Sequence, residues 1–332
     1  MNQPIRRSQL NAIKLRALVR EHLGVDDAAL PAGAGEFGGG AALLNDSGGG
    51  TMAAWILLDE RPERGLGAAL AWALRRNAVE LHVLADQSTG TLARRAQGFA
   101  YPISVWHVEG RTLLPAVAEP LPVAPPVPAE HAVWTESITE GGAVAVIEHG
   151  VLAGEVQGLE VCRVVTDAYT DEVRLEVGVG AHDREAFQML HGNRPTTEAL
   201  DDVVGSVSAH RQLGAPRHPL NMLAQERALR ARLIAEPELI GAASVAATAP
   251  PIPRPNLKDP IPCVAVATID GRSVTVVCSS GVDLDLMPYA IDARAALGTN
   301  DCVVVLPVRD ALDVQLRLAA LASPPLTVLT VG

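Results

Sequence analysis

The sequence predicts an α/β protein in which two β-α-β-α-β modules flank a β-rich α+β middle module. Three observations support this fold class. Apolar runs of strand length alternate with helical stretches near both ends of the chain. The two series span similar lengths, Ile56–His107 and Val276–Leu329. Between them several strand-like runs follow one another directly, which favours an antiparallel sheet in the middle of the chain.

The N-terminal module opens with an amphipathic helix over Gln9–Leu23. Its further elements are expected, in order, as strand Met52–Leu58, helix Gly67–Arg76, strand Glu80–Ala85, helix Gly90–Gly98 and strand Ile103–Val108. Because the strands are apolar and alternate with helices, we expect parallel strands covered by helices. The glycine-rich segment 32–50 is expected to be a flexible loop or a strand between loops.

The C-terminal module repeats this order of elements. Its elements are expected as strand Ser273–Val277, helix Asp285–Leu297, strand Cys302–Leu306, helix Val314–Leu321 and strand Leu326–Val331. The common order and similar length favour an internal duplication. Two unrelated series of the same common type remain the alternative.

The middle module has a different pattern. Strands are expected at Ala143–Ile147, Gly154–Val165 and Val173–Gly180, followed by helices Arg184–Leu190 and Thr197–His210. Two proline-rich stretches divide the sequence, and both are expected to be extended because residues before proline avoid helical conformation. The expected organisation is therefore an N-terminal module 1–112, a linker 113–128, a middle module 129–212 and a C-terminal module 213–332 that contains a proline-rich loop 246–262.

Charge and cysteine usage narrow the classes of partner. The chain has 38 acidic and 27 basic residues and a formal net charge of −11, which disfavours a non-specific grip on duplex nucleic acid. Lysine occurs only at Lys14 and Lys258, which indicates a GC-rich bacterial genome; selection of arginine for phosphate contacts is the alternative.

The four cysteines form no C-x-x-C pair, so we expect buried thiols in a reduced cytoplasm. No secretory signal and no apolar run of membrane-spanning length is visible, so no membrane partner is expected.

Two segments of the C-terminal module resemble known nucleases. Glu226–Ile240 (ERALRARLIAEPELI) resembles the opening helix of NucS-type endonucleases, which has the form E-x-x-L-x-x-x-L-x-x-x-P-x-L-I. Ile269–Gly281 (IDGRSVTVVCSSG) is similar to the D-G-R hairpin of the wider PD-(D/E)XK, or restriction-endonuclease-like, superfamily. Ala85–Gly110 resembles the end of the same core. The resemblance implies restriction-endonuclease-like modules with a core order close to αβββαβ.

The resemblance also implies where a catalytic centre would lie. Nucleases of this superfamily use one aspartate and a Glu-x-Lys motif, whose carboxylates hold a divalent metal ion. Alignment on Asp270 places Val277 and Ser279 at the Glu and Lys positions. The Asp position falls near Cys263, although a small gap brings Asp259 there. Valine does not ligate a metal ion and serine carries no charge, so the motif is degenerate and no cofactor is expected. Mg²⁺ or Mn²⁺ is expected only if the chain has an active centre at another place.

The middle module offers such a relocated centre. Glu155, Glu160 and Glu176 lie on predicted strands, and His182 follows the last of them. Glu160 and Glu176, if they face one another, would bind a cation or act as acid and base. The alternative is that these carboxylates occupy the solvent face of a half-exposed antiparallel sheet.

Two further groups of charged residues belong to the N-terminal module. Asp59 and Glu60 follow a strand and form either a metal pair or a solvated turn. The solvated turn is favoured, because adjacent residues of a strand point to opposite faces. The predicted helices carry four arginines in two pairs, Arg75, Arg76, Arg94 and Arg95. These form either a basic strip that contacts phosphates or ordinary solvated helix faces.

Three hypotheses about function follow. The first is a catalytically degenerate nuclease-fold protein that acts as a binding or assembly module, with a protein partner or self-association and with nucleic acid as a possible associate. The second is an enzyme that uses the carboxylates and His182 of the middle module. The third is a homo-oligomeric structural protein whose apolar surplus is buried between subunits.

Overall fold

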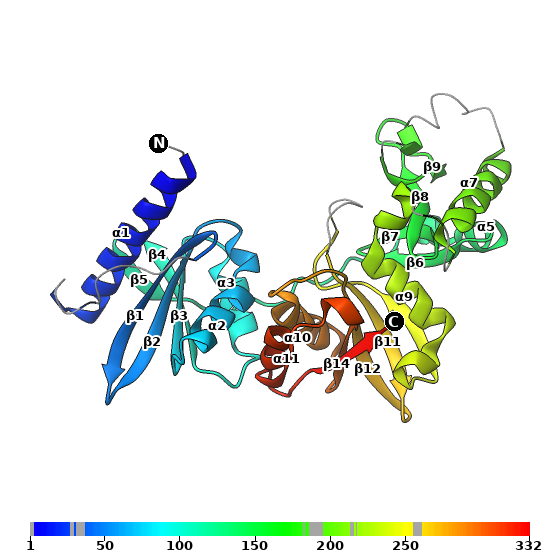
Figure 1. Ribbon diagram of the computed structural model, residues 1–332. Helices are drawn as coiled ribbons and strands as arrows, with labels where there is room; N and C mark the ends of the chain where they lie inside the picture. The colour runs from blue at the N-terminus through cyan, green and yellow to red at the C-terminus, as the bar shows by residue number, and fades with distance from the viewer. Residues whose placement is uncertain are drawn as a thin grey trace. The chain divides into compact units, whose positions relative to one another are not determined.

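The structure, a computed structural model, describes residues 3–26, 30, 37–181, 183–185, 195–212, 216, 218–254 and 261–332. It shows an α/β protein with two mixed sheets of five strands and, between them in the sequence, an antiparallel sheet of four strands (Figure 1). Contacts divide the chain into two compact units. The first comprises Met1–Leu121, Val282–Asp292 and Leu312–Thr327, and the second comprises Pro122–Gly281, Ala293–Ala311 and Val328–Gly332.

The first unit is built on a sheet with the order β1-β2-β3-β4-β5. The strands are β1 (Gly40–Gly48), β2 (Thr51–Leu58), β3 (Glu80–Ala85), β4 (Ile103–Glu109) and β5 (Thr112–Pro115), and the helices are α1 (Gln3–Leu23), α2 (Leu66–Arg75) and α3 (Thr89–Ala96). β2, β3 and β4 pair in parallel, as their apolar composition predicted. β1 and β5 add antiparallel edges. β5 continues the hairpin to Pro115, into the stretch expected as the linker.

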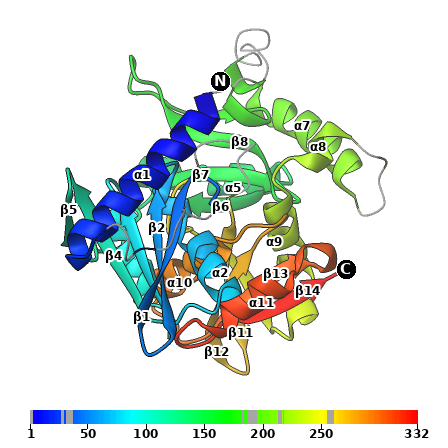
Figure 2. The same cartoon turned by 60° about the vertical axis from the view of Figure 1, so that its left-hand side comes forward.

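Helices cover both faces of this sheet. α1 lies along one face, and α2 and α3 lie on the other (Figure 1; Figure 2). Leu15, Leu18 and Val19 follow a helical spacing on α1 and pack with Trp55 and Leu57 of β2 in one core cluster. The double cover explains why β2 is apolar at every position from Met52 onward.

Two glycines allow C-terminal segments to pack on α2 and α3 within the first unit. A Cβ atom at Gly67 would lie 1.8 Å from the carbonyl oxygen of Leu284, and one at Gly98 would lie 2.3 Å from the side chain of Ile291. Leu284 precedes α10 (Leu286–Leu297) and Ile291 lies on it, and α11 (Asp313–Ala320) also contacts α2. A larger residue at either glycine would separate these segments.

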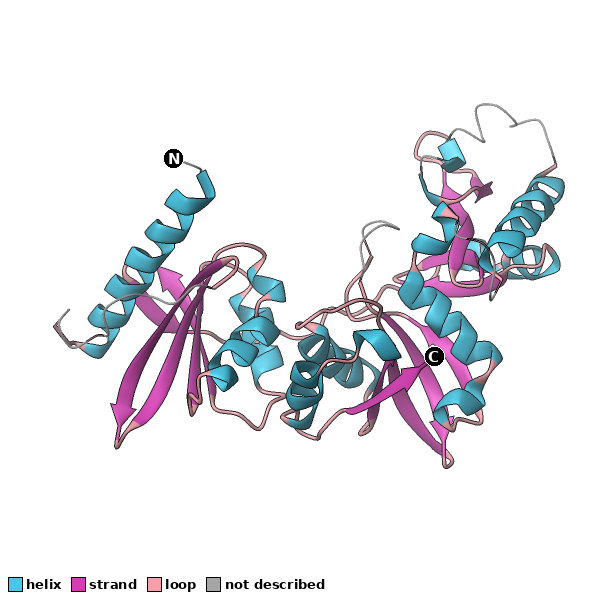
Figure 3. Cartoon of the chain, in the orientation of Figure 1, coloured by secondary structure: helices cyan, strands magenta, loops and turns pink. Residues whose placement is uncertain are grey.

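The second unit contains the antiparallel sheet β6-β7-β8-β9, with α7 packed beside it (Figure 3). The elements are α4 (Ala129–Ala132), α5 (Thr135–Glu140), β6 (Val144–Glu148), β7 (Val151–Val156), β8 (Leu159–Thr166), β9 (Val173–Val177), α7 (Thr196–Arg211) and α8 (Pro219–Met222). The prediction of a single strand over Gly154–Val165 is wrong. Gln157 and Gly158 adopt positive φ angles of 46° and 77°, which turns the chain into a β7–β8 hairpin. The predicted helix at Thr197–His210 is confirmed as α7, whereas most of 184–190 lies outside the described residues.

The second five-stranded sheet has the order β10-β11-β12-β13-β14. Its strands are β10 (Ser244–Thr248), β11 (Cys263–Ile269), β12 (Arg272–Cys278), β13 (Cys302–Pro307) and β14 (Thr327–Val331), and α9 (Gln225–Ala235) contacts the first three. β10, β11 and β12 pair antiparallel, and β12 and β13 pair parallel. The chain order α9-β10-β11-β12-α10-β13 is therefore the αβββαβ order that the resemblance implied. α9 stops before Pro237, which cannot continue the helix, so the expected helix to Ile240 ends in a 3₁₀ turn.

The two five-stranded sheets share a connectivity. In each, an antiparallel hairpin is followed by a helix and a parallel strand, as β1-β2-α2-β3 and as β11-β12-α10-β13. The second hairpin turns at Asp270 and Gly271, whose φ angles are 50° and 73°. An internal duplication predicts this repetition and stays a prediction.

Candidate functional site at helix α9

Four charged side chains meet where α9 packs on the four-stranded sheet. Arg227 and Arg230 are three residues apart and therefore share one face of α9. Glu148 of β6 and Glu155 of β7 share one face of the sheet, because Glu148 pairs with Val151 and alternate strand residues point the same way. These four residues, Glu148, Glu155, Arg227 and Arg230, are named here the α9 ion cluster.

Each arginine of the α9 ion cluster contacts both carboxylates. Arg230 donates from Nη1 to Glu148 Oε1 over 2.7 Å and from Nη2 to Glu155 Oε2 over 3.1 Å. Arg227 donates to Glu155 and to Glu148 through its two terminal nitrogens. Arg230 donates a further bond to the carbonyl of Val264 on β11, so the cluster joins α9 to both sheets of the second unit.

The charges of the cluster are buried and compensated. Arg230 is 0% exposed and Glu155 is 4% exposed. Burial acts to raise the pKa of Glu155, but the Arg230 and Arg227 charges outweigh it and leave that pKa below its ordinary value. Burial acts to lower the pKa of both arginines, and the carboxylates reverse that effect. Arg227, Arg230 and Glu155 are therefore charged at neutral pH. Removal of one side chain of the cluster would leave the buried charges unbalanced.

A second layer of polar groups lies against α9. Glu226, whose pKa burial raises, forms an ion pair with Arg254 across 3.0 Å. Cys263 donates its thiol to the carbonyl of Glu226 over 3.2 Å. A hydrogen bond with Cys263, together with burial, raises the pKa of the neighbouring Cys278. Both thiols are buried, and the raised pKa of Cys278 makes it a poor nucleophile.

The positions that the resemblance assigned to a metal centre carry no ligand set. Cys263 lies directly opposite Cys278, and both pack with Leu233 in the core cluster below α9. Val264, not Cys263, lies opposite Val277, so it is Val264 that shares a face with Val277 and Ser279. Val277 is 0% exposed and Ser279 is 2% exposed. The face therefore presents two valines and a serine, whereas Asp259 lies outside the described residues.

The carboxylates predicted for the middle module are each held by arginine. Arg163 donates to both oxygens of Glu160, over 2.9 and 2.8 Å, and Arg184 donates to the same carboxylate over 2.7 Å. Glu176 accepts from Arg174 over 2.9 Å and lies 3.8 Å from Arg184. Glu160 and Glu176 do not oppose one another in the sheet, because Glu160 opposes Glu155 and Glu176 opposes Arg163. Glu155 belongs to the α9 ion cluster, and His182 lies outside the described residues.

Asp59 and Glu60 are directed to α1. Asp59 Oδ2 accepts from Arg7 Nε over 2.6 Å and from Asn11 Nδ2 over 2.8 Å, and the hydrogen bond from Arg7 lowers the pKa of this carboxyl. Glu60 lies 3.2 Å from Arg7 Nη1. Asp59 and Glu60 thus anchor α1. Across the part of the chain that the structure describes, no group of three or more His, Cys, Asp or Glu side chains is placed to hold a metal ion.

The four arginines of the predicted strip separate into two kinds. Arg95 is 3% exposed and donates to Asp292 over 2.7 Å and to Asp285 over 3.0 Å, so the expectation that it lies on a surface strip is wrong. Arg94 donates to Asp292 over 3.0 Å. Arg75 is exposed, and Arg76 lies over the ring of Trp72 at 3.8 Å from its centroid. Of these four arginines, only Arg75 and Arg76 are available to an outside anion.

Sequence reasoning missed the arginines that hold the carboxylates. Arg227 and Arg230 were visible as a pair at helical spacing, but nothing in the sequence linked them to Glu148 and Glu155, which are more than 70 residues away. Arg184 came after a predicted strand and carried no motif. The unusual frequency of carboxylates on strands was the signal that could have found the cluster, because buried carboxylates need cationic partners.

No family model, curated protein or solved structure matches the chain. The described residues contain no helix that is both long and apolar enough to cross a bilayer. The α/β fold is therefore established by the structure alone.

Proposed function

We propose that the chain is a non-catalytic binding or assembly protein built on restriction-endonuclease-like modules. The lost metal ligands carry the proposal, and the α9 ion cluster supports it. In the nucleases that the C-terminal module resembles, one aspartate and a Glu-x-Lys motif hold a divalent metal ion. In this chain the corresponding sheet face presents Val264, Val277 and Ser279, and the charged side chains of the α9 ion cluster neutralise one another.

The contacts of the α9 ion cluster favour a structural role, because its charged groups bind one another and the backbone. Two arginines of α9 bind two carboxylates of the four-stranded sheet and one carbonyl of β11. A catalytic base or metal ligand needs a carboxylate with a free lone pair facing a substrate. Glu155, Glu160 and Glu176 are all engaged by guanidinium groups, which also argues against a relocated enzyme centre in the middle module.

Nucleic acid is a partner that one surface of the first unit supports. Arg75 and Arg76 end α2, where they stay accessible, and Arg76 is stacked on Trp72. The test is fluorescence anisotropy with labelled single-stranded, duplex and branched DNA at low and at physiological salt. We expect salt-sensitive binding that Arg75→Glu/Arg76→Glu abolishes. Arg272→Glu/Arg309→Glu makes the same charge change at exposed sites of the second unit and is the matched control. Absence of binding at low salt would exclude nucleic acid as a partner and leave protein assembly as the proposed role.

Self-association is the second candidate, and one observation favours it. Leu10 and Ile13 lie three residues apart on α1 and are 65% and 67% exposed. Apolar side chains at this spacing form one helix face suited to a protein contact. Light scattering at micromolar concentration should show an oligomer that Leu10→Glu/Ile13→Glu converts to a monomer. Val117→Glu/Val123→Glu, at 85% and 92% exposed positions off the helix, is the control.

A further inference from the structure

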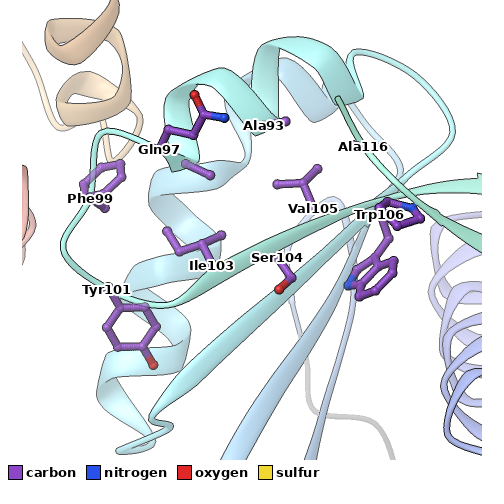
Figure 4. Close-up of a pocket in the computed structure, with 11 residues that line it drawn as sticks. Ala93, Gln97, Phe99, Tyr101, Ile103, Ser104, Val105, Trp106 and Ala116 are labelled. Atoms are coloured by element: carbon purple, nitrogen blue, oxygen red, sulfur yellow. The ribbon is translucent and has the colours of Figure 1, made fainter. Parts of the chain in front are cut away.

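A pocket of about 420 Å³ lies between α3 and the first half of β4 in the first unit. Gln97 of α3 lines one wall, and the side chains of Ile103 and Val105 on β4 point toward that helix (Figure 4). Ala116, one residue after β5, lines the pocket beside Val105. The pocket therefore lies where a helix overhangs the edge of a strand.

The edge of β4 that faces away from β3 is only partly paired. β5 pairs with β4 no further than Trp106, and Ala116 adds one hydrogen bond to the carbonyl of Val105 over 2.9 Å. On the other side, Leu81 of β3 donates to the carbonyl of Pro102 over 2.9 Å. Because the bonding direction alternates along a strand, the N–H and C=O groups of Ile103 and Val105 all point away from β3.

Three backbone groups on this edge have no partner among the described residues. They are the N–H and the C=O of Ile103 and the N–H of Val105. Val105 is only 8% exposed, and buried backbone groups are rarely left unpaired. A ligand that offers an acceptor, a donor and a second acceptor in that order along the edge would pair all three groups.

A peptide strand parallel to β4 presents its groups in that order. In a parallel pair, a residue bonds to the two residues that flank the one opposite it. A peptide residue opposite Pro102 would accept from the N–H of Ile103. A peptide residue opposite Ser104 would donate to the carbonyl of Ile103 and accept from the N–H of Val105. Three consecutive peptide residues therefore suffice for the three hydrogen bonds.

An antiparallel peptide matches the edge less well. It would exchange two hydrogen bonds with Ile103, but it would reach the N–H of Val105 only from the position opposite Val105. Ala116 already occupies that position. The parallel peptide needs no residue there, because its paired part ends opposite Ser104. Ala116 thus sets the direction of the peptide and the point at which its pairing ends.

The lining favours an uncharged segment. None of the residues that line the pocket is an Asp, Glu, Lys, Arg or His, and burial raises the pKa of Tyr101 to about 12, so its hydroxyl stays neutral. A charged side chain would find no counterion there. The middle residue of the peptide lies opposite Ile103, so its side chain points toward α3 and Gln97 as that of Ile103 does (Figure 4).

We propose that this edge binds an extended, uncharged peptide segment of a partner protein, which adds in parallel to β4 and ends its pairing beside Ala116. The backbone hydrogen bonds supply affinity, and the middle side chain, which enters the pocket under α3, supplies specificity. The inference rests on the proposed binding role and names its partner. Its test is separate, because a failure to bind peptide would leave the DNA-binding and self-association tests unaffected.

NMR titration of the ¹⁵N-labelled full chain with acetyl-Thr-Val-Thr-amide tests the site. We expect saturable shifts of the Ile103 and Val105 amide signals. N-methylation of the third peptide residue removes the N–H that meets the carbonyl of Ile103 and should weaken binding about tenfold. N-methylation of the second residue changes an N–H that points away from β4, so it is the matched control and should leave affinity within about threefold.

A nitroxide in place of the acetyl group reports the direction of the peptide. It should broaden signals near Tyr101, which precedes β4. Broadening near Ala116 would show an antiparallel peptide and overturn the proposal. No saturable shift of the Ile103 and Val105 signals up to millimolar peptide, or equal binding by the two methylated peptides, would also overturn it.

Two substitutions test the same edge from the side of the chain. Ile103→Pro removes one N–H at an open edge, where a strand tolerates proline, and should weaken binding about tenfold, whereas Ile103→Val should not. Gln97→Trp narrows the pocket and should weaken binding, and Gln87→Trp makes the same change at an exposed site outside it. Equal binding by these two tryptophan variants would contradict the proposal. If Ile103→Pro fails to fold, the methylated peptides still decide, because they leave the chain unaltered.

Discussion

Arg230 of α9 and Glu155 of β7 form a buried ion pair with Nη2 and Oε2 3.1 Å apart, although 75 residues separate them in the sequence. Glu148 of β6 and Arg227 of α9 complete the cluster. The contact fixes α9 to the four-stranded sheet. Its energetic importance is measurable by substitution.

Glu155→Gln should destabilise the fold by about 3–5 kcal/mol, because it leaves Arg227 and Arg230 with one carboxylate between them in a buried site. Urea unfolding followed by circular dichroism measures the change. Glu130→Gln makes the same chemical change at an exposed position and should lie within about 0.5 kcal/mol of the unaltered chain. Equal stabilities for the two variants would contradict a structural role for the cluster.

Gly158→Ala should be far more destabilising than Gly110→Ala. Both glycines have positive φ angles, 77° and 60°, so the backbone strain is similar. A Cβ at Gly158 would also lie 2.2 Å from the carbonyl oxygen of Arg227, whereas none of the described atoms lies within 4 Å of one at Gly110. Thermal unfolding of the two variants compares them. A similar loss in both would show that the β7–β8 turn does not press on α9.

Asp285 should make the chain less stable as pH rises. Burial raises the pKa of this carboxyl to about 7, against the opposing charge of Arg95. The folded state therefore keeps a proton that the unfolded state releases, and the associated stability is complete below pH 4 and lost as pH rises to 7. The slope reaches about 1.4 kcal/mol per pH unit. Asp285→Asn should flatten this part of the stability profile, and an unchanged profile would contradict the assignment.

His82 should titrate far below an ordinary histidine. Burial, with a smaller effect of His22, lowers its pKa to about 4. The neutral ring accepts the Trp106 N–H, so stability from this group is present above pH 6.5 and lost as pH falls toward 4. Proton NMR of the His82 ring, assigned with His82→Gln, measures the midpoint. A midpoint near 6.5 would show that the ring is hydrated rather than packed on Trp55.

The parallel strands and their helices were predictable because each carries a continuous apolar run or a helical period. β2, β3 and β13 are examples, and they lie within a residue or two of their expected limits. β1 and β10 were harder, since one lies in a glycine-rich segment and the other next to a proline-rich one. The β7–β8 turn was hidden because Gln157 and Gly158 interrupt the strand pattern for only two residues.

The candidate site was predictable in its composition but not in its pairing. The sequence shows carboxylates on strands and arginines on a helix, yet the register and the packing of α9 decide which ones meet. Arg95 illustrates the same point, because a helical arginine pair looks identical in sequence whether it faces solvent or Asp285 and Asp292. Only tertiary contacts separate Arg95 from the accessible Arg75.

A cleavage assay with labelled single-stranded, duplex and branched DNA and with RNA, in Mg²⁺ or Mn²⁺, tests the central claim most directly. The account predicts no product above the level of a metal-free control, and no change on Asp59→Asn or Glu176→Gln. Metal-dependent cleavage that disappears in either variant would contradict the claim that the chain is non-catalytic.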